Sequence, residues 1–426
     1  MNISDLTSEL IDWRFKAFPI RDKAPAISEV PDLGWDAFTD FALPVLVLKD
    51  SAIQHNIDLM GSFCRNHGVS LAPHAKTPLS PQIALRQLAA GAWGLSVATI
   101  HHARVMRAMG VTRILLANQL LEKHPLEWIA GEMLADSLFD FTCLVDSQRG
   151  VDVMEGHLRS SGVTTASRKL RVLLEMGVAG GRTGCRSINE ALDLAKRVLA
   201  SPYLELAGVE TYENVFDLGK FAESLRDVDR LLDVVRELVM RLDGDGCFAH
   251  LDEVIVSAGG SIYFDRVVER LTGWTLSKPV RVVLRSGSYV TQDAVNYGEL
   301  SPLGGRRTSG EPLRQALELW TTVVSRPERG LIVLGFGKRD VAHDRGVPIP
   351  FAVRKGDRPV ESSETLSVIS LNDHHARCLI AQDQSLEVGD LVGLHVSHPC
   401  TTFDNWRLIP LVDDEYHVLE AIRSYL

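Results

Sequence analysis

The chain lacks an excess of positive charge. Its 45 lysines and arginines are outnumbered by 55 aspartates and glutamates, which gives a formal net charge of −10. Proteins that bind nucleic acid need a basic face to contact the phosphate backbone. A short basic pair such as Arg306-Arg307 is too small for that purpose. The charge balance therefore argues against a nucleic-acid partner.

Cysteine is scarce, and long apolar runs are absent. Six cysteines are scattered along the chain and none forms a CxxC pair, so we expect reduced thiols rather than a disulfide framework. The longest apolar run, around residues 88–100, is too short to cross a bilayer and contains Gly91 and Gly94. The polar N-terminus lacks the basic and apolar regions of a signal peptide. These absences favour a cytoplasmic protein with no membrane partner.

What the chain does have is a regular alternation between residues 69 and 290. Short apolar runs alternate with longer segments of helical spacing, such as 100–109 with Ile100, Ala103 and Met106 on one face. Near-continuous apolar runs are typical of strands that are buried on both faces of a sheet. Eight such units predict an α/β fold with a closed (β/α)8 barrel, and a doubly wound sheet is the alternative. The eight expected strands are Val69–Pro73, Trp93–Ala98, Arg113–Asn118, Phe141–Asp146, Lys169–Met176, Leu206–Tyr212, Glu253–Ala258 and Val280–Arg285.

The pattern changes after about Pro302. Short apolar runs separated by turns predict a mostly antiparallel β module, with no long helical pattern before the C-terminal tail. We therefore expect three parts. Residues 1–43 form an irregular segment that packs on the β module, residues 44–300 form the barrel, and residues 301–426 form the β domain. The segment 298–314 is rich in glycine, serine and proline and is a plausible linker.

Polar residues and glycines follow the expected barrel strands, at the ends where active sites of such barrels gather. These segments are His74-Ala75-Lys76, Asn118-Gln119, Asp146, Gly177–Gly184, Glu210–Asn214, Gly259–Ser261 and Ser286–Asp293. Lys76 follows an apolar run, so we expect its amine to be shielded from water, which favours the neutral form that bonds to aldehydes. Most lysines, however, are solvated surface charges.

A glycine-rich turn, Ser257-Ala258-Gly259-Gly260-Ser261, follows the seventh expected strand. Glycines let a ligand approach the backbone closely, and free N–H groups at such a turn can bind a phosphate. Phosphate sites in these barrels favour the loops after strands seven and eight. The alternative is an ordinary tight turn.

His398 and Cys400 are two residues apart, so on an extended segment their side chains point the same way. An imidazole and a thiolate side by side suit Zn²⁺, and two protein ligands leave positions for water or substrate. Asp404 could supply a third ligand or orient the histidine. His395 would face away from His398 and is interpreted as structural. A chance HxC spacing remains the alternative interpretation.

Two further residues could contact a cofactor. Arg182 follows the fifth expected strand and could place its guanidinium against a carboxylate or a ring oxygen. Tyr212 ends the sixth strand and could reach a ring nitrogen. Each could equally be a core or rim residue.

Together these motifs resemble the fold-type III pyridoxal-phosphate enzymes, in the branch of D-serine dehydratases and D-threonine aldolases. Six motifs in the same order carry the resemblance, and they cover most of the chain. They are Pro73-His-Ala-Lys-Thr77, Arg182-Thr-Gly184, Gly208-Val-Glu-Thr-Tyr212, Ser257-Ala-Gly-Gly-Ser261, Arg285-Ser-Gly-Ser-Tyr289 with Asp293, and His398-Pro-Cys400 with Asp404. The chain departs from the family at Pro78-Leu79, where relatives usually have His-Lys, and at Glu213, where many have histidine.

The resemblance implies a role for each motif. Lys76 resembles the Schiff-base lysine, and Arg182 the arginine beside it. The remaining cofactor contacts implied are His74, Tyr212, Ser257, Gly259, Gly260, Ser261 and Tyr289. It also implies substrate contacts at Asp293 and Asp404, and metal ligands at His398 and Cys400.

The family further implies an alanine racemase-like barrel, a C-terminal β domain and a homodimer with shared active sites. Dehydratases of this branch tend to show HxC and the aldolases HxD, so Cys400 favours dehydration. The expected activity is that of a zinc- and pyridoxal-phosphate-dependent lyase that converts D-serine, or another D-3-hydroxy amino acid, to a keto acid and ammonia. The alternatives are a metal-dependent D-threonine aldolase, an amino-acid racemase and a non-catalytic pyridoxal-phosphate carrier.

Overall fold

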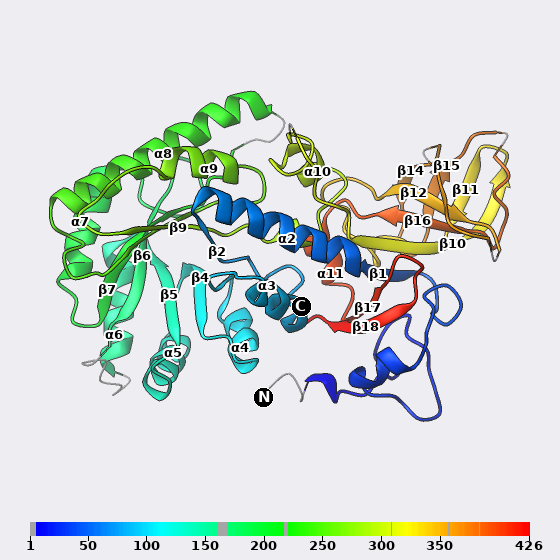
Figure 1. Ribbon diagram of the computed structural model, residues 1–426, viewed down its shortest axis with the longest axis horizontal. Coiled ribbons are helices and arrows are strands. Elements are labelled where there is room, and N and C mark those ends of the chain that lie inside the picture. Colours follow the sequence, from blue (N-terminus) through cyan, green and yellow to red (C-terminus); the bar gives the residue numbers. More distant parts are fainter. Residues whose placement is uncertain are drawn as a thin grey trace. The chain divides into compact units, whose positions relative to one another are not determined.

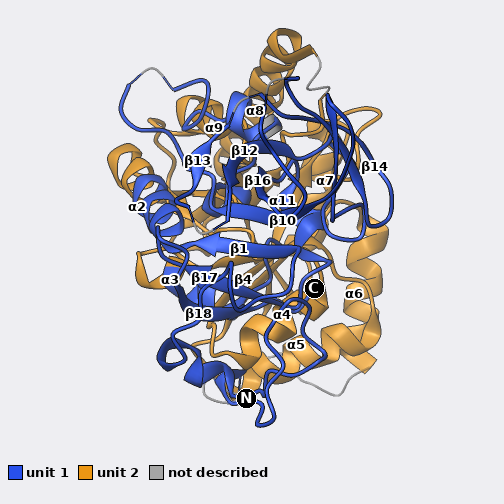
Figure 2. Ribbon diagram, turned by 90° about the vertical axis from the view of Figure 1, so that its right-hand side faces the viewer, with its two compact units in different colours: residues 1–60, 76–86, 288–426 blue, residues 61–75, 87–287 orange. Residues whose placement is uncertain are grey.

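The computed structural model of the chain describes residues 6–160, 168–216, 220–307, 309–356, 358–363, 365–382 and 384–426. Its contacts divide the chain into two compact units (Figure 2). The barrel unit comprises residues 61–75 and 87–287, and the β unit comprises residues 1–60, 76–86 and 288–426. The domain ranges expected from the sequence, 1–43, 44–300 and 301–426, remain a prediction about which parts fold independently.

The barrel unit contains eight parallel strands in one curled sheet (Figure 1). They pair in the order β2-β9-β8-β7-β6-β5-β4-β3. Backbone bonds also join the two ends of this order, because the Trp93 N–H donates to the Leu71 carbonyl at 2.7 Å and a parallel bridge links His74 to Ser96. The predicted eight-stranded barrel is therefore confirmed. Its strands are β2 (Ser70–Leu71), β3 (Leu95–Val97), β4 (Arg113–Gln119), β5 (Asp140–Val145), β6 (Leu170–Met176), β7 (Leu204–Thr211), β8 (Val254–Ala258) and β9 (Val280–Leu284).

Helices follow the strands and lie outside the sheet (Figure 1). In the barrel unit they are α4 (Ile100–Ala108), α5 (Lys123–Ala135), α6 (Gln148–Ser160), α7 (Ile188–Leu199), α8 (Phe221–Gly244) and α9 (Phe264–Leu271). Helix α3 (Pro81–Ala89) begins in the β unit and ends in the barrel unit. In α7 the buried stripe Ala191, Leu194, Ala195 and Val198 faces inward, which is the spacing of an amphipathic helix. Strands β5, β7 and β8 are almost wholly buried, as expected for a sheet covered on both faces.

The β unit has a ten-stranded, mostly antiparallel sheet, which confirms the predicted β module. Only the β1–β17 pair is parallel among its described pairings. The strands are β1 (Val45–Lys49), β10 (Leu317–Glu328), β11 (Leu331–Leu334), β12 (Ile349–Arg354), β13 (Glu361–Ser362), β14 (Ser367–Leu371), β15 (Ala376–Leu379), β16 (Leu391–His395), β17 (Leu408–Val412) and β18 (Val418–Arg423). The C-terminal tail, where a helical pattern was expected, forms β17 and β18. The sequence analysis also missed β1, β12 and β13.

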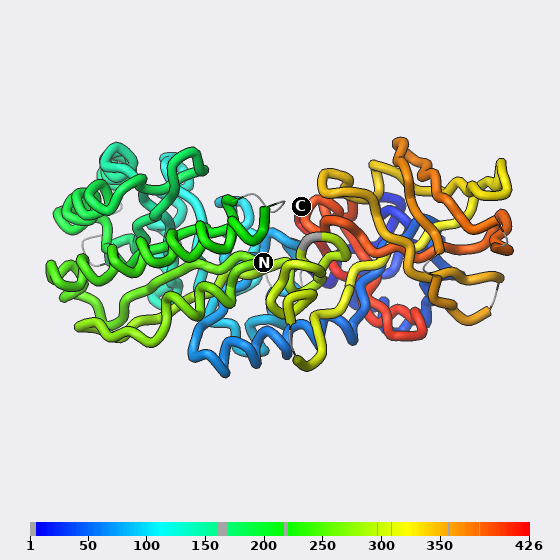
Figure 3. The backbone as a smooth tube through the Cα atoms, turned by 90° about the horizontal axis from the view of Figure 1, so that it is seen from above, coloured from blue at the N-terminus to red at the C-terminus, as the bar shows by residue number. Residues whose placement is uncertain are grey.

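The N-terminal segment contributes to the core of the β unit. Phe15, Phe18 and Trp35 are buried in one cluster with Val45 and Trp320. Figure 3 shows the N-terminal segment, in blue, running among the C-terminal strands, in red. Short helices complete this unit: η1 (Ile27–Asp32), η4 (Ser288–Val290), α10 (Asn296–Leu300) and α11 (Pro399–Phe403), with α2 (Asp50–His67) starting in it. No helix among the described residues combines the length and apolarity that crossing a bilayer requires.

Candidate functional site

A buried ion pair joins two barrel strands at their C-terminal ends. The guanidinium of Arg285, just after β9, donates to the carboxylate of Glu210 on β7 and to the Thr211 carbonyl at 2.9 Å. Burial raises the pKa of Glu210 to about 7, although the charge of Arg285 opposes that rise. Neither residue was singled out for this pairing from the sequence, where an arginine after an apolar strand gives no sign of its partner.

Glu175, at the end of β6, connects that strand to the following loop. Its carboxylate accepts hydrogen bonds from Gln119 Nε2 at 2.5 Å and from Thr183 Oγ1 at 2.6 Å. Thr183 belongs to the Arg182-Thr183-Gly184 motif. The barrel mouth therefore holds this motif in place through a carboxylate that the sequence analysis did not identify.

Arg182 and Tyr212 lie together, as a shared cofactor site requires. The guanidinium carbon of Arg182 is 4.6 Å from the centroid of the Tyr212 ring, within the range of a cation–π contact. Tyr212 follows β7 directly, and burial raises the pKa of its phenol. A neutral phenol is therefore available as a hydrogen-bonding group beside a guanidinium.

The loop that carries Arg182 is held by Arg186, which the sequence analysis missed. The Arg186 guanidinium donates to the carbonyls of Thr183 and Gly184 at 2.7 and 2.6 Å, and to those of Gly181 and Arg182 at 3.1 and 3.2 Å. One side chain thus satisfies four consecutive carbonyls of an exposed turn.

The glycine-rich turn directs two amides at one carboxylate. Gly259 has φ +101°, a conformation that residues with a side chain rarely adopt. The N–H groups of Gly259 and Gly260 donate to the two oxygens of Glu213, at 3.0 and 2.5 Å. The two N–H groups therefore point at one anionic side chain of the same chain, and the predicted phosphate site stays a prediction.

The remaining predicted residues near this turn differ in their burial and in their hydrogen bonds. Ser257 is buried, and its hydroxyl donates to the Val283 carbonyl at 3.1 Å, which links β8 to β9. Ser261 is half-buried. His74 is half-buried, and its backbone pairs with Ser96 where the barrel closes.

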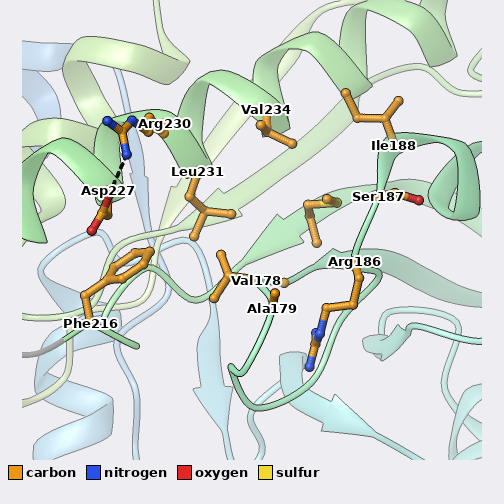
Figure 4. A pocket seen from close by; sticks show the side chains of 12 residues that line it. Val178, Ala179, Arg186, Ser187, Ile188, Phe216, Asp227, Arg230, Leu231 and Val234 are labelled. Carbon is orange, nitrogen blue, oxygen red and sulfur yellow. Dashed lines mark hydrogen bonds and ion pairs between the residues drawn. The ribbon is translucent and has the colours of Figure 1, made fainter.

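A pocket of about 410 Å³ lies beside this mouth in the barrel unit (Figure 4). Leu231 and Val234 of α8 face Val178 across it, and Arg230 pairs with Asp227 at its edge. No predicted cofactor residue is among the twelve described residues that line it. A smaller pocket lined by Arg182 and Tyr212 shares Met176, Gly177, Val178 and Leu231 with it, so the pocket adjoins these two predicted residues.

Lys76 and Thr77 belong to the β unit. Lys76 is exposed, so the expectation that the barrel strand would shield its amine from water is wrong for the chain as described. The reason is local: β2 ends at Leu71, and the turn that follows carries Lys76 five residues beyond it. Thr77 is buried.

His398 and Cys400 form a contacting pair in the same unit. Burial works against the thiolate, but the hydrogen bond from His398, the Thr77 hydroxyl and the charge of Lys76 lower the pKa of Cys400 to about 7. Burial likewise opposes the imidazolium, yet hydrogen bonding to Cys400 raises the pKa of His398. Ser288 Oγ is 3.8 Å from Cys400 Sγ. Lys76, Thr77, His398 and Cys400 are thus neighbours.

Asp344 holds the histidine of this pair. His398 Nδ1 lies 2.8 and 3.0 Å from the two oxygens of Asp344, and the imidazole also interacts with the Cys400 thiol. The sequence analysis assigned the possible orienting role to Asp404, which instead ends α11 and is exposed. Within the described part of the chain, no group of three His, Cys, Asp or Glu side chains is arranged to hold a metal.

Tyr289 and Asp293 lie after β9 in the β unit, and both are buried. Tyr289 is in η4, next to Ser288. One oxygen of Asp293 accepts the N–H groups of Val295 and Tyr297 at 3.0 and 2.9 Å, so this carboxylate shapes the turn into α10. His395, at the end of β16, stacks on Phe351 at 4.0 Å, and burial lowers its pKa to about 4, which supports its structural interpretation.

Comparisons with known proteins agree with this geometry. The model of the alanine racemase N-terminal domain matches residues 49–250, and that of a putative serine dehydratase domain matches residues 316–412. The chain is 24% identical to a 3-hydroxy-D-aspartate aldolase of Paracoccus denitrificans (strain Pd 1222), over 88% of this chain and 90% of that protein. It is 27% identical to a D-threo-3-hydroxyaspartate dehydratase of Delftia sp. (strain HT23), over 73% and 75%.

Solved structures show the same fold. A D-threonine aldolase from Filomicrobium marinum matches with a TM-score of 0.71 and 25% identity, over 90% of this chain and 95% of that one. A cysteine-to-alanine variant of D-threo-3-hydroxyaspartate dehydratase, described as metal-free, matches with a TM-score of 0.68 and 21% identity, over 90% and 97%.

Proposed function

Because the chain belongs to the fold-type III family of pyridoxal-phosphate enzymes, in the branch of D-serine dehydratases and D-threonine aldolases, we propose that it is a lyase of D-3-hydroxy amino acids. We propose further that it is a dehydratase, with D-serine the first substrate to test. The observation that carries this proposal is the His398–Cys400 pair, held by Asp344 and adjacent to Lys76.

The residues present fit a divalent metal. A buried imidazole lies beside a thiol of lowered pKa, and nitrogen with sulfur is a donor set that zinc favours. Asp344 on the far nitrogen is the usual support for a metal-binding histidine. The variant of the related dehydratase that is described as metal-free supports a metal in that protein.

The residues also fit pyridoxal phosphate. The N–H groups of Gly259 and Gly260 already donate hydrogen bonds to a carboxylate, that of Glu213. Tyr212 beside Arg182 offers a phenol next to a guanidinium. Lys76 is the lysine that the family resemblance assigns to the aldehyde. When bound, pyridoxal phosphate supplies an electron sink for charge that develops at the substrate Cα.

Each of the chain's own residues is then assigned a separate role. Lys76 Nζ takes the proton from the substrate Cα. His398 and Cys400 would hold the cation, and a cation bound there would supply Lewis-acid assistance to the departing hydroxide. Asp344 engages the imidazole at Nδ1, which leaves Nε2 available. Arg182 keeps the Tyr212 ring in place. These roles favour elimination of the β-hydroxyl as water, and hydrolysis of the resulting enamine then gives a keto acid and ammonia.

The test is a product assay on the full chain with pyridoxal phosphate, with and without zinc. D-Serine, D-threonine and D-threo-3-hydroxyaspartate are each incubated, and keto acid, glycine and aldehyde are measured separately. We expect keto acid with ammonia, and a loss of at least about tenfold when a chelator removes the metal. Activity that is indifferent to metal would contradict the Lewis-acid role.

Two variants test the residues behind the assay. Cys400→Ala should lose both bound zinc and keto-acid formation while keeping the visible absorbance of the bound cofactor. Lys76→Ala should lose that absorbance. Cys247→Ala is the control, because Cys247 is a buried cysteine of the barrel unit, in the turn after α8. Full turnover in Cys400→Ala would refute the metal assignment.

Aldol cleavage is the second candidate function. It is favoured by the similarity to the Paracoccus aldolase along 88% of the chain and to the Filomicrobium aldolase structure. A cation held by His398 and Cys400 would then assist loss of the proton from the substrate β-hydroxyl, and the Cα–Cβ bond would break in place of the Cβ–O bond. Glycine plus an aldehyde in the product assay would establish this function in place of dehydration.

A further inference from the structure

Glu213 lies on the amides that the cofactor's phosphate is expected to use. The side chain is fully buried at 0% exposure. Each of its oxygens accepts one N–H group, from Gly259 at 3.0 Å and from Gly260 at 2.5 Å. A Cβ on Gly260 would lie 3.3 Å from Glu213 Oε1, so the carboxylate sits directly over the turn. An anion is therefore already bound at this turn.

A phosphate group cannot use these two N–H groups while Glu213 keeps them. Each N–H donates one good hydrogen bond, and a phosphate beside an unmoved, buried carboxylate would bring like charges into contact. Arg285 attracts Glu213 electrostatically, but the Arg285 guanidinium is already paired with Glu210. The negative charge of Glu213 thus opposes a second anion.

We propose that Glu213 is a built-in competitor of the cofactor's phosphate. In the cofactor-free chain its carboxylate occupies the Gly259 and Gly260 amides, and it leaves them when the phosphate binds. This inference rests on the proposed function for the identity of the phosphate carrier. Glu213 departs from the family pattern, in which many members have histidine. Its contacts with the Gly259 and Gly260 amides show what the glutamate does at this position.

Displacement of Glu213 affects the rest of the predicted cofactor site. Glu213 directly follows Tyr212, whose ring contacts the Arg182 guanidinium and whose hydroxyl interacts with Asn214. The backbone of 212–214 is therefore shared between the phosphate seat and the predicted ring contact. Binding of the phosphate is coupled to a rearrangement of this segment, and the affinity for the cofactor is lower than the turn alone would give.

The test compares two ligands that differ only in the phosphate. Pyridoxal phosphate and pyridoxal are titrated into the cofactor-stripped full chain, and inorganic phosphate is titrated separately by calorimetry. Glu213→Gln keeps the shape and removes the charge, so the affinity for pyridoxal phosphate and for phosphate should rise at least about tenfold. Affinity for pyridoxal should not change. Glu205→Gln is the matched control, because Glu205 lies on β7, the strand that precedes Glu213, and is ion-paired with Arg171.

A second variant covers the case in which Glu213→Gln fails to fold. Glu213→Asp keeps the charge but is one methylene shorter and cannot reach both amides, so a smaller gain for pyridoxal phosphate is expected. Unchanged or weaker phosphate binding in the folded variants would overturn the inference, because the carboxylate would then support the turn rather than compete for it. A gain for inorganic phosphate without binding of pyridoxal phosphate to any form would uphold the competitor and refute the proposed function.

Discussion

At the scale of the residue, Asp344 is the side chain on which the metal proposal depends most. It is half exposed, yet both its oxygens lie within 3.0 Å of His398 Nδ1, and Thr401 Oγ1 donates to it at 3.2 Å. Hydrogen bonding to His398 lowers the pKa of Asp344 although partial burial works against this. A charged acceptor on one ring nitrogen makes the other nitrogen a better metal ligand.

Asp344→Asn should therefore weaken zinc binding while leaving both ligands in place. We expect a loss of about 10- to 100-fold in affinity, since an amide orients the ring but does not carry the charge. The measurement is competition against a chromophoric chelator with the full-length protein. Asp373→Asn is the control, because Asp373 is an exposed acid of the same unit that pairs with Arg339. Equal zinc affinity in the two variants would mean that Asp344 is a surface partner only.

The residues that were missed share a property. Asp344, Arg186 and Glu213 are charged residues in loops, and a charged loop residue in a sequence is usually solvated. Their roles come from partners that lie 54 positions away for Asp344 and 46 for Glu213. By contrast, the histidine and cysteine of the metal pair are two residues apart, so spacing alone could suggest their contact. The metal pair was therefore predictable from spacing, whereas the distant partners of Asp344 and Glu213 were not. Arg186 was missed although the carbonyls it binds are only two to five residues away.

At the scale of the element, the loop between β6 and α7 is organised by one arginine. The Arg186 guanidinium spans the carbonyls of residues 181–184, and its backbone N–H donates to Glu190 at 2.8 Å. The next residue, Ser187, begins α7 with a capping box in which its hydroxyl and Glu190 satisfy each other's N–H groups. The loop with Arg182 is thereby fixed at the start of a stable helix.

Arg186→Ala should loosen this loop without unfolding the barrel. The substitution removes four hydrogen bonds from an exposed guanidinium at once. We therefore expect about tenfold faster amide exchange in residues 181–184 and a decrease of about 1 kcal/mol in the free energy of unfolding. Hydrogen-exchange mass spectrometry and urea unfolding measure the two effects. Arg230→Ala is the control: Arg230 is an exposed arginine that lines the 410 Å³ pocket together with Arg186 and pairs with Asp227. This variant should change neither the amide exchange nor the stability. Unaltered exchange in Arg186→Ala would show that the backbone alone holds the loop.

The elements themselves were predictable to different degrees. The barrel strands stood out because strands such as β7 and β8 are apolar on both faces. Strand β1 escaped because Val45–Lys49 precedes an amphipathic helix and resembles the start of a β/α unit. Its partners are β10 and β17, about 270 and 360 residues later. Periodicity describes what a segment can form, whereas the sheet it joins is decided by contacts far along the chain.

At the scale of the whole molecule, three separate segments of the chain form the β unit: 1–60, 76–86 and 288–426. Strand β1 lies between β10 and β17, with Val45 opposite Trp320 and Leu48 opposite Leu411. Phe15 and Trp35 pack in the same cluster as Trp320. The sheet of the β unit is therefore incomplete without the N-terminal sixty residues.

This arrangement predicts that residues 301–426, the expected C-terminal domain, do not fold when expressed alone. Without β1, strands β10 and β17 keep unpaired edges inside what should be a continuous sheet, and Trp320 loses the apolar cover that buries it. The measurement is the amide dispersion of an NMR spectrum together with the cooperativity of thermal unfolding. A fusion of residues 1–60 to 288–426 through a flexible linker restores β1 and should recover dispersed signals. A sharp, cooperative transition in the isolated 301–426 fragment would show instead that the β domain is autonomous and that β1 is an added edge.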